Sequence, residues 1–168
     1  MNCGFEKVSR VANIDFKLPE RSTKHSAGYD FYAIEDINIP SFITELLRHK
    51  HLESMDGCSR GIVRPYCIKT GVKAYMDSNI CLQLYARSSW PLKLGLTLAN
   101  NVGIIDSDYY NNPDNEGEIG FLVYNLTLHD VVINKGDKLG QGIFTKFYII
   151  NHDNALAERV GGFGSTGE

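Results

Sequence analysis

The chain has 168 residues, 43% of them hydrophobic, which suits one domain with a substantial core. Its net charge of −3 excludes the basic surface field of proteins that bind DNA or RNA, although local Arg and Lys side chains can still hold a small anion. The first ten residues contain no apolar stretch, so we expect no signal peptide, no membrane span and a cytoplasmic setting.

Residues 41–53, SFITELLRHKHLE, are the first stretch with a helical pattern, because apolar side chains recur four residues apart. Phe42 pairs with Leu46 in this pattern, and Ile43 pairs with Leu47. The Pro-Ser pair at 40–41 is a suitable helix start, and the Asp-Gly pair at 56–57 a suitable stop.

The rest of the chain reads mainly as short strands. In residues 80–86, Ile80, Leu82 and Leu84 alternate with Cys81, Gln83 and Tyr85, which is typical of a half-buried strand. Residues 117–133 and 142–150 are rich in β-branched and aromatic side chains. A tight turn is expected at 135–137, and a short helix within 88–95, capped by Ser88 or Ser89 with Pro91 in its first turn. Short strands with frequent turns indicate a sandwich or barrel.

The last ten residues, RVGGFGSTGE (159–168), cannot pack a core. Either this tail is a frayed end, or something outside its own domain orders it. It lacks the GxxxxGK[ST] phosphate loop, but glycines can expose N–H groups as an anion nest, and Ser165 and Thr166 add donors. Phe163 suits stacking on a flat ring.

A second cluster lies in ANNVGIIDSDYY, residues 99–110. Apolar residues lead into Asp106, and Asp108 and Tyr109 follow. A carboxylate in this setting could orient or deprotonate a water. An ordinary Asx turn explains the pattern equally well.

Three further stretches carry weaker signals. ARSS, residues 86–89, places Arg87 beside two hydroxyls at a helix start, which suits an oxyanion but also a plain helix cap. SAGYDFYA places Asp30 where a turn leads into a strand, and GDKLGQGIF places the polar Gln141 in an apolar strand. Each has a purely structural explanation.

The order of these five stretches is more specific than any one of them. AGYDFYA, ARSS, NNVGIIDSDYY, GDKLGQGIF and RVGGFGSTG resemble, in order and approximate spacing, the five motifs of the trimeric dUTPases (deoxyuridine triphosphate nucleotidohydrolases). TGVKAYM, residues 70–76, resembles the strand before the second motif of that family. The resemblance covers residues 27–167 and is to the bacterial or phage type.

The resemblance implies an all-β fold, a distorted jelly-roll or β-barrel subunit assembled as a homotrimer. Residues 1–158 would form the β domain, and 159–168 a mobile arm that closes over nucleotide. Each active site would be built from all three chains. The implied reaction is Mg²⁺-dependent hydrolysis of dUTP to dUMP and pyrophosphate, which clears dUTP from the nucleotide pool and supplies the dTMP precursor.

The resemblance also implies roles for single residues. Asp106 would activate the water that attacks the α-phosphorus, and Tyr109 would pack on the deoxyribose and reject UTP. Uracil would be read by Asn100 and by hairpin backbone groups at Gly103 and Ile104. Phosphate contacts would come from Arg87, Ser88, Ser89 and Gln141. Asp30 would hold Mg²⁺ through water. In the arm, Arg159 would reach the γ-phosphate, Phe163 would stack on uracil, and Gly164, Ser165 and Thr166 would wrap the phosphates.

The sequence departs from the family pattern in four places. The arm is one residue short between Arg159 and its Gly-Gly pair, YNNPDNEGEI (110–119) extends the third motif, and Trp90-Pro91 alters the second. The largest departure is an insertion at 41–64, expected to be helical and to pack Phe42 and Leu46 on the barrel. It could instead bind a partner protein.

A metal site in the insertion is not expected, because the spacing of His49, His51 and Cys58 fits no zinc signature. Cys3, Cys58, Cys67 and Cys81 are expected to be reduced thiols, some of them buried. Two alternative functions remain: a dCTP deaminase of the same fold, and a nucleotide-sensing regulator that binds a partner through residues 41–64.

Overall fold

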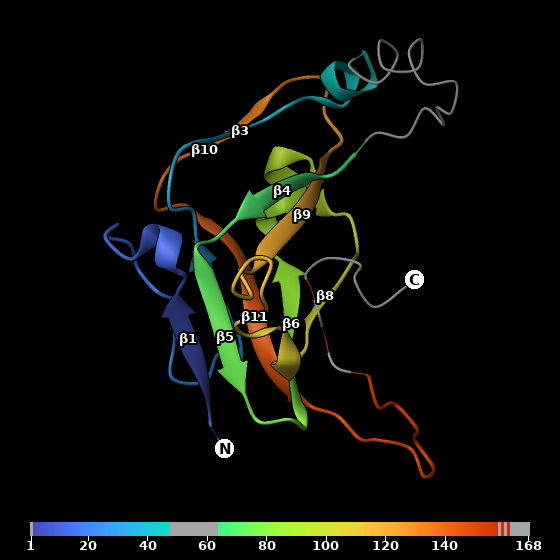
Figure 1. Cartoon of the computed structure of the whole chain (residues 1–168). Coiled ribbons are helices and arrows are strands. Elements are labelled where there is room, and N and C mark those ends of the chain that lie inside the picture. Colours follow the sequence, from blue (N-terminus) through green and yellow to red (C-terminus); the bar gives the residue numbers. More distant parts are fainter. Residues whose placement is uncertain (1, 48–63, 158, 160, 162–168) are drawn as a thin grey trace.

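The computed structural model describes residues 2–47, 64–157, 159 and 161 (Figure 1). Within this part the chain is built mainly from strands, which confirms the predicted all-β class. The strands are β1 (Cys3–Lys7), β2 (Tyr29–Tyr32), β3 (Ile37–Ile39), β4 (Tyr66–Lys69), β5 (Val72–Met76), β6 (Ile80–Ala86), β7 (Leu96–Leu98), β8 (Gly103–Ile105), β9 (Gly120–Asn125), β10 (Val131–Ile133) and β11 (Lys138–Lys146). The short helical turns are η1 (Ser9–Val11), η2 (Trp90–Leu94) and η3 (Ser107–Tyr109).

The strands pair antiparallel in four small sheets. The largest has the order β2-β11-β6-β8, and a second has the order β4-β9-β7. The other two are the pairs β1-β5 and β3-β10, and β3-β10 lies at the far end of the molecule from the N-terminus in Figure 1. Many short antiparallel strands with one buried face each give the layered all-β packing that the sequence predicted.

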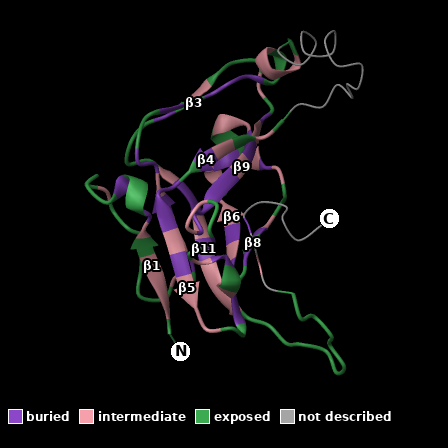
Figure 2. Cartoon of the chain, in the orientation of Figure 1, coloured by how far each residue is buried: buried purple, intermediate pink, exposed green. Residues whose placement is uncertain are grey.

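β6 and β11 form the centre of the main sheet. Ile80, Leu82 and Leu84 of β6 are at most 2% exposed, as their alternation predicted, and Cys81 is buried as well. Figure 2 shows buried stretches along β5, β6, β9 and β11. A register shift interrupts the pairing of β11 with β2 between Lys138 and Gly140, which bends the strand where it begins.

Aromatic rings fill the space between the sheets. The ring of Phe121 on β9 lies 5.5 Å from that of Phe31 on β2 and 6.4 Å from that of Trp90 in η2, both in edge contacts. Such contacts add to the large apolar area that these side chains bury. The Trp-Pro pair therefore starts a helical turn that anchors the core.

The predicted helical and turn segments are found in the described part. η2 follows Ser89, has Pro91 in its first turn and ends at Gly95 with φ of 61°. Ser89 holds the N-cap position, but its side chain makes no capping hydrogen bond, contrary to the predicted cap. The turn at 135–137 is closed by the Asp137 amide, which donates to the Asn134 carbonyl at 2.9 Å. No helix in the described residues is long and apolar enough to cross a membrane.

Residues 42–47 of the insertion form a helix, which confirms its predicted start. The Ser41 hydroxyl accepts from the Thr44 amide at 3.1 Å, as an N-cap does. Phe42 keeps 40% of its surface exposed, against the prediction that it packs on the barrel, whereas Leu46 is half-buried. The expected stop at 56–57 lies outside the described residues.

Candidate functional site

The third motif places an exposed carboxylate directly after a strand. β8 ends at Ile105, Asp106 has extended dihedrals, and its carbonyl accepts from the Tyr109 amide at 3.1 Å, which closes η3. The side chains of Asp106 and Asp108 are 50% and 56% exposed, while Tyr109 is only 5% exposed. Strand end and tight turn together present two carboxylates to solvent beside a fixed aromatic ring.

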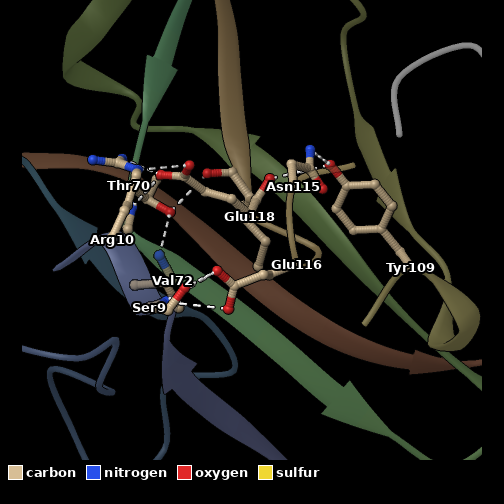
Figure 3. A network of polar contacts seen from close by, with 10 residues as sticks. Ser9, Arg10, Thr70, Val72, Tyr109, Asn115, Glu116 and Glu118 are labelled. Carbon is tan, nitrogen blue, oxygen red and sulfur yellow. Dashed lines mark hydrogen bonds and ion pairs between the residues drawn. The ribbon is translucent and has the colours of Figure 1, made fainter. Parts of the chain in front are cut away.

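The hydroxyl of Tyr109 is held from two sides. It donates to the Glu118 carbonyl at 3.1 Å and accepts from Asn115 Nδ2 at 2.8 Å (Figure 3). Burial raises the pKa of this hydroxyl. The Tyr109 hydroxyl therefore stays protonated near pH 7.

Arg159 lies against this motif in its own chain. Its Nη2 is 2.6 Å from Asp106 Oδ2, and its Nε is 2.8 Å from Asp108 Oδ1. The guanidinium carbon is 5.7 Å from the centre of the Tyr109 ring, a cation–π distance. One arginine thus covers both carboxylates and the ring, and its side chain is only 13% exposed.

Asn100, Gly103 and Ile104 lie in and after the turn that leads into β8. Ile104 is 52% exposed, and a Cβ at Gly103 would lie 3.5 Å from Asn100 Nδ2. The predicted hairpin is wrong here, because β7 pairs with β9 whereas β8 pairs with β6. The turn instead carries the chain from one sheet to the other, which separates the two strands and leaves Ile104 exposed to solvent.

The first and fourth motifs meet on neighbouring strands. Asp30 of β2 lies opposite Gln141 of β11. A Cβ at Gly28 would lie 2.2 Å from Gln141 Oε1, so the glycine leaves the space that the amide occupies. Asp30 Oδ2 accepts from Lys138 Nζ at 2.6 Å and from the Ser22 hydroxyl at 2.5 Å.

The pKa of Asp30 is lowered overall. Burial acts to raise it, but the bonds from Lys138 and Ser22 and the charge of Arg87 outweigh burial. Arg87 of the second motif, just after β6, is therefore close enough to act on the first. Ser88 and Ser89 follow it and lead into η2. Three motifs thus gather at one end of the main sheet.

The two groups of motifs lie at opposite ends of β6. Ile105 pairs with Leu82, which places Asp106 level with Cys81, six residues from Arg87. At the usual rise of a strand this is about 20 Å. The single chain therefore does not bring Asp106 and Tyr109 together with Asp30, Arg87 and Gln141.

Some predicted groups cannot be placed. Phe163, Gly164, Ser165 and Thr166 lie outside the described residues, as do His49, His51 and Cys58. No group of three His, Cys, Asp or Glu suited to a metal occurs among the residues that the structure describes. Cys3, Cys67 and Cys81 are free thiols, and Cys81 is buried, as expected.

Sequence reasoning missed several residues of these clusters, among them Lys138 and Asn115. Lys138 lies in the fourth motif, but its contact with Asp30 depends on the pairing of β11 with β2, which no local pattern shows. Asn115 lies in the polar extension after Tyr109, where its asparagines were a signal only of turns.

Comparison with known proteins decides the family. A model described as dUTPase matches residues 51–167. The chain belongs to the dUTPase family. It is 43% identical over 166 residues to the deoxyuridine 5′-triphosphate nucleotidohydrolase of Lactococcus lactis, which covers 98% of this chain and 97% of that protein. It is 32% identical over 172 residues to the enzyme of Rickettsia akari, with 99% of each covered.

Solved structures agree with this assignment. The crystal structure of a dUTPase from Streptococcus mutans covers 88% of this chain and 98% of its own, at 38% identity and a TM-score of 0.68. A dUTPase from phage phi11 of S. aureus, whose species-specific insert was visualised, shares the fold at 19% identity and a TM-score of 0.63. The chain is thus a dUTP diphosphatase that hydrolyses dUTP to dUMP and pyrophosphate, not a dCTP deaminase.

Proposed function

We propose that this dUTPase works as a homotrimer in which Asp106 of one chain activates the attacking water and neighbouring chains supply the phosphate contacts. The observation that carries this proposal is the separation of about 20 Å along β6 between Asp106 and Arg87. A general base must lie within one water of the reacting atom. The phosphate contacts at Arg87 and its neighbours that serve Asp106 must then come from another copy of the chain.

Exposed apolar side chains after β11 support assembly. Tyr148 is 87% exposed, Ile150 79% and Leu156 92%. Apolar side chains concentrated in one segment commonly mark an interface. In a cyclic trimer each copy would use the same surface, so three equivalent sites would form.

The nucleoside would bind at β8 and η3. The ring of Tyr109 would pack on the deoxyribose, where a 2′-hydroxyl would clash, and so exclude UTP. Asn100, Gly103 and Ile104 would contact uracil, consistent with the exposure of Ile104. Close packing there would exclude the thymine methyl, and the amide of Asn100 would select uracil over cytosine.

The triphosphate would bind at the other end of a neighbouring chain, at Arg87, Ser88, Ser89 and Gln141. Both bonds to Asp30 from Lys138 and Ser22 end on Oδ2. Oδ1 of this ionised carboxylate suits a water of a hydrated Mg²⁺, which sheds its waters reluctantly. Bound Mg²⁺ would neutralise charge on the triphosphate.

Arg159 would exchange partners when substrate binds. In the chain alone it forms ion pairs with Asp106 and Asp108. We propose that the γ-phosphate takes over the guanidinium, which frees Asp106 for the water. The rest of the arm would contribute Phe163 to uracil and Gly164, Ser165 and Thr166 to the phosphates.

Asp106→Asn tests the role of the carboxylate. Pyrophosphate release from dUTP with Mg²⁺ should fall by about 10²–10⁴-fold, because an amide cannot accept the proton. The melting temperature should change little, since Asp106 is exposed. Asp153→Asn, another exposed position, is the control. Activity of Asp106→Asn equal to that of the control would refute the role, and activity that survives chelation by EDTA would refute the need for Mg²⁺.

The insertion offers a second candidate role. Phe42, Ile43 and Leu47 are 40%, 43% and 55% exposed on the helix at 42–47, so this helix presents an apolar face that a partner protein could cover. A pull-down with and without residues 41–64 tests this, and an unchanged partner list would reject it. A cytoplasmic setting and a role in clearing dUTP from the nucleotide pool stay predictions.

A further inference from the structure

The extension after Tyr109 forms a bonded unit around that residue. Asn115 donates to the Tyr109 hydroxyl, and its Oδ1 accepts from Asn112 Nδ2 at 2.8 Å and from the Gly117 amide at 3.0 Å. The Asn112 amide also donates to the Tyr109 carbonyl at 2.9 Å. The amide of Asn115 is therefore oriented before it meets the phenol oxygen.

The acceptor of the Tyr109 hydroxyl is held as well. Its partner is the carbonyl of Glu118, whose side chain is only 7% exposed. The Glu118 carboxylate accepts from two nitrogens of Arg10, with Nε at 3.0 Å, and from the Gly71 amide at 2.8 Å (Figure 3). A two-bonded arginine–carboxylate pair has a well-defined geometry. It ties η1 at the start of the chain to the residue that holds Tyr109.

The backbone of the extension also needs its glycine. Gly117 has φ of 79°, and a Cβ there would lie 2.4 Å from the Tyr109 carbonyl oxygen. Glu116, with φ of 60°, accepts from the Ser9 amide. Residues 115–118 thus press closely on Tyr109 and are anchored at a second point to η1.

We propose that Asn115 and the Arg10–Glu118 pair are positioning residues that fix the ring of Tyr109 and thereby set the preference of the enzyme for deoxyribose over ribose. This rests on the proposed function, in which the Tyr109 ring excludes the 2′-hydroxyl. Exclusion by contact requires that the ring cannot retreat, and a phenol held by both a donor and an acceptor cannot shift without breaking a buried bond. Neither residue needs to touch the substrate.

The test is the ratio of kcat/KM for dUTP to kcat/KM for UTP. Asn115→Ala removes one hydrogen bond to the hydroxyl and should lower this ratio by roughly three- to tenfold, mainly through faster use of UTP. Arg10→Ala should lower it in the same direction, and Arg10→Lys should restore only part. Asn38→Ala also removes one side-chain hydrogen bond, that to Asp130, but lies on β3, and should leave the ratio unchanged. A lower melting temperature with an unchanged ratio in Asn115→Ala would overturn the proposal.

A double-mutant cycle shows whether Asn115 acts through the hydroxyl. Tyr109→Phe keeps the ring and removes the oxygen, so Asn115→Ala should have no further effect on the ratio in that background. Full additivity of the two changes would overturn the proposal. Tyr109→Ala tests the selective role of Tyr109 separately from the positioning role of Asn115. If Tyr109→Ala leaves the ratio unchanged, the role proposed for Tyr109 itself fails. If it abolishes selection while Asn115→Ala leaves the ratio unchanged, only the positioning role fails.

Discussion

At the scale of single residues, Asp30 shows how neighbours keep a carboxylate ionised. Its pKa is lowered, so its contribution to stability is present above the unfolded pKa of about 3.9 and is lost as the pH falls through the lower folded value. Asp30→Asn should therefore reduce the free energy of unfolding at pH 7 and make little difference at strongly acidic pH. Urea titrations at several pH values measure the free energy of unfolding of both proteins. A difference between the wild type and Asp30→Asn that grows as the pH falls would contradict this prediction.

Arg159 carries a second prediction at this scale. If it binds the γ-phosphate, Arg159→Ala should reduce kcat/KM for dUTP by roughly 10–100-fold, the value of a charge-assisted hydrogen bond. Inhibition by dUMP, which has no γ-phosphate, should hardly change. Initial rates of dUTP hydrolysis with and without dUMP give both kcat/KM for dUTP and the inhibition constant of dUMP. Equal weakening of dUTP and dUMP would mean that Arg159 serves the nucleoside pocket instead.

At the scale of elements, Gly140 in the main sheet and Gly28 just before β2 should respond differently to an added methyl group. A Cβ at Gly140 of β11 would lie 2.6 Å from the Tyr85 carbonyl of β6, a backbone atom that cannot move without disturbing the strand pairing. Gly140→Ala should therefore cost about 1–3 kcal/mol of stability, as overpacking does. Thermal unfolding measures this cost.

Gly28→Ala is the matched substitution. The atom it meets is Oε1 of Gln141, the far end of a flexible side chain, so stability should change little. Activity should fall, because Gln141 is displaced from its proposed phosphate contact. Loss of stability without loss of activity in Gly28→Ala would place Gln141 outside the site.

The elements also show what local sequence can and cannot predict. The alternation of Ile80, Leu82 and Leu84 predicted β6, because side-chain period and burial are local properties. The resemblance implies a hairpin around Gly103 and Ile104, but β7 and β8, the strands on either side of that turn, do not pair with each other. Which sheet each strand joins depends on partners far along the chain, and β8 joins β6 instead.

The candidate site likewise contains some residues that the sequence predicted and others that it did not. The motif residues at Asp30, Asp106 and Gln141 were found from their order along the chain. Lys138 beside Asp30, and Arg10 bound to Glu118 across more than 100 residues, were not. Such contacts follow from the packing of η1 and β11 against distant segments, and carry no signature at either end.

At the scale of the whole molecule, the chain should not remain a monomer. The exposed apolar side chains at 148–150 would be costly to leave in water. Light scattering should give three times the chain mass of 18.8 kDa at micromolar concentration. A monomer that hydrolyses dUTP at the full rate would contradict the shared site.

The most direct test of the shared site mixes two inactive variants. Asp106→Asn and Arg87→Ala remove functional groups beside opposite ends of β6, so we expect a homotrimer of either variant to be nearly inactive. Co-expressed with different tags and purified through both, they should form trimers in which some sites combine an intact Asp106 from one chain with an intact Arg87 from another. Every trimer that holds both variants has one intact site out of three, so dUTP hydrolysis should recover to about a third of the wild-type rate. No recovery in verified mixed trimers would place the whole site within one chain and refute the account.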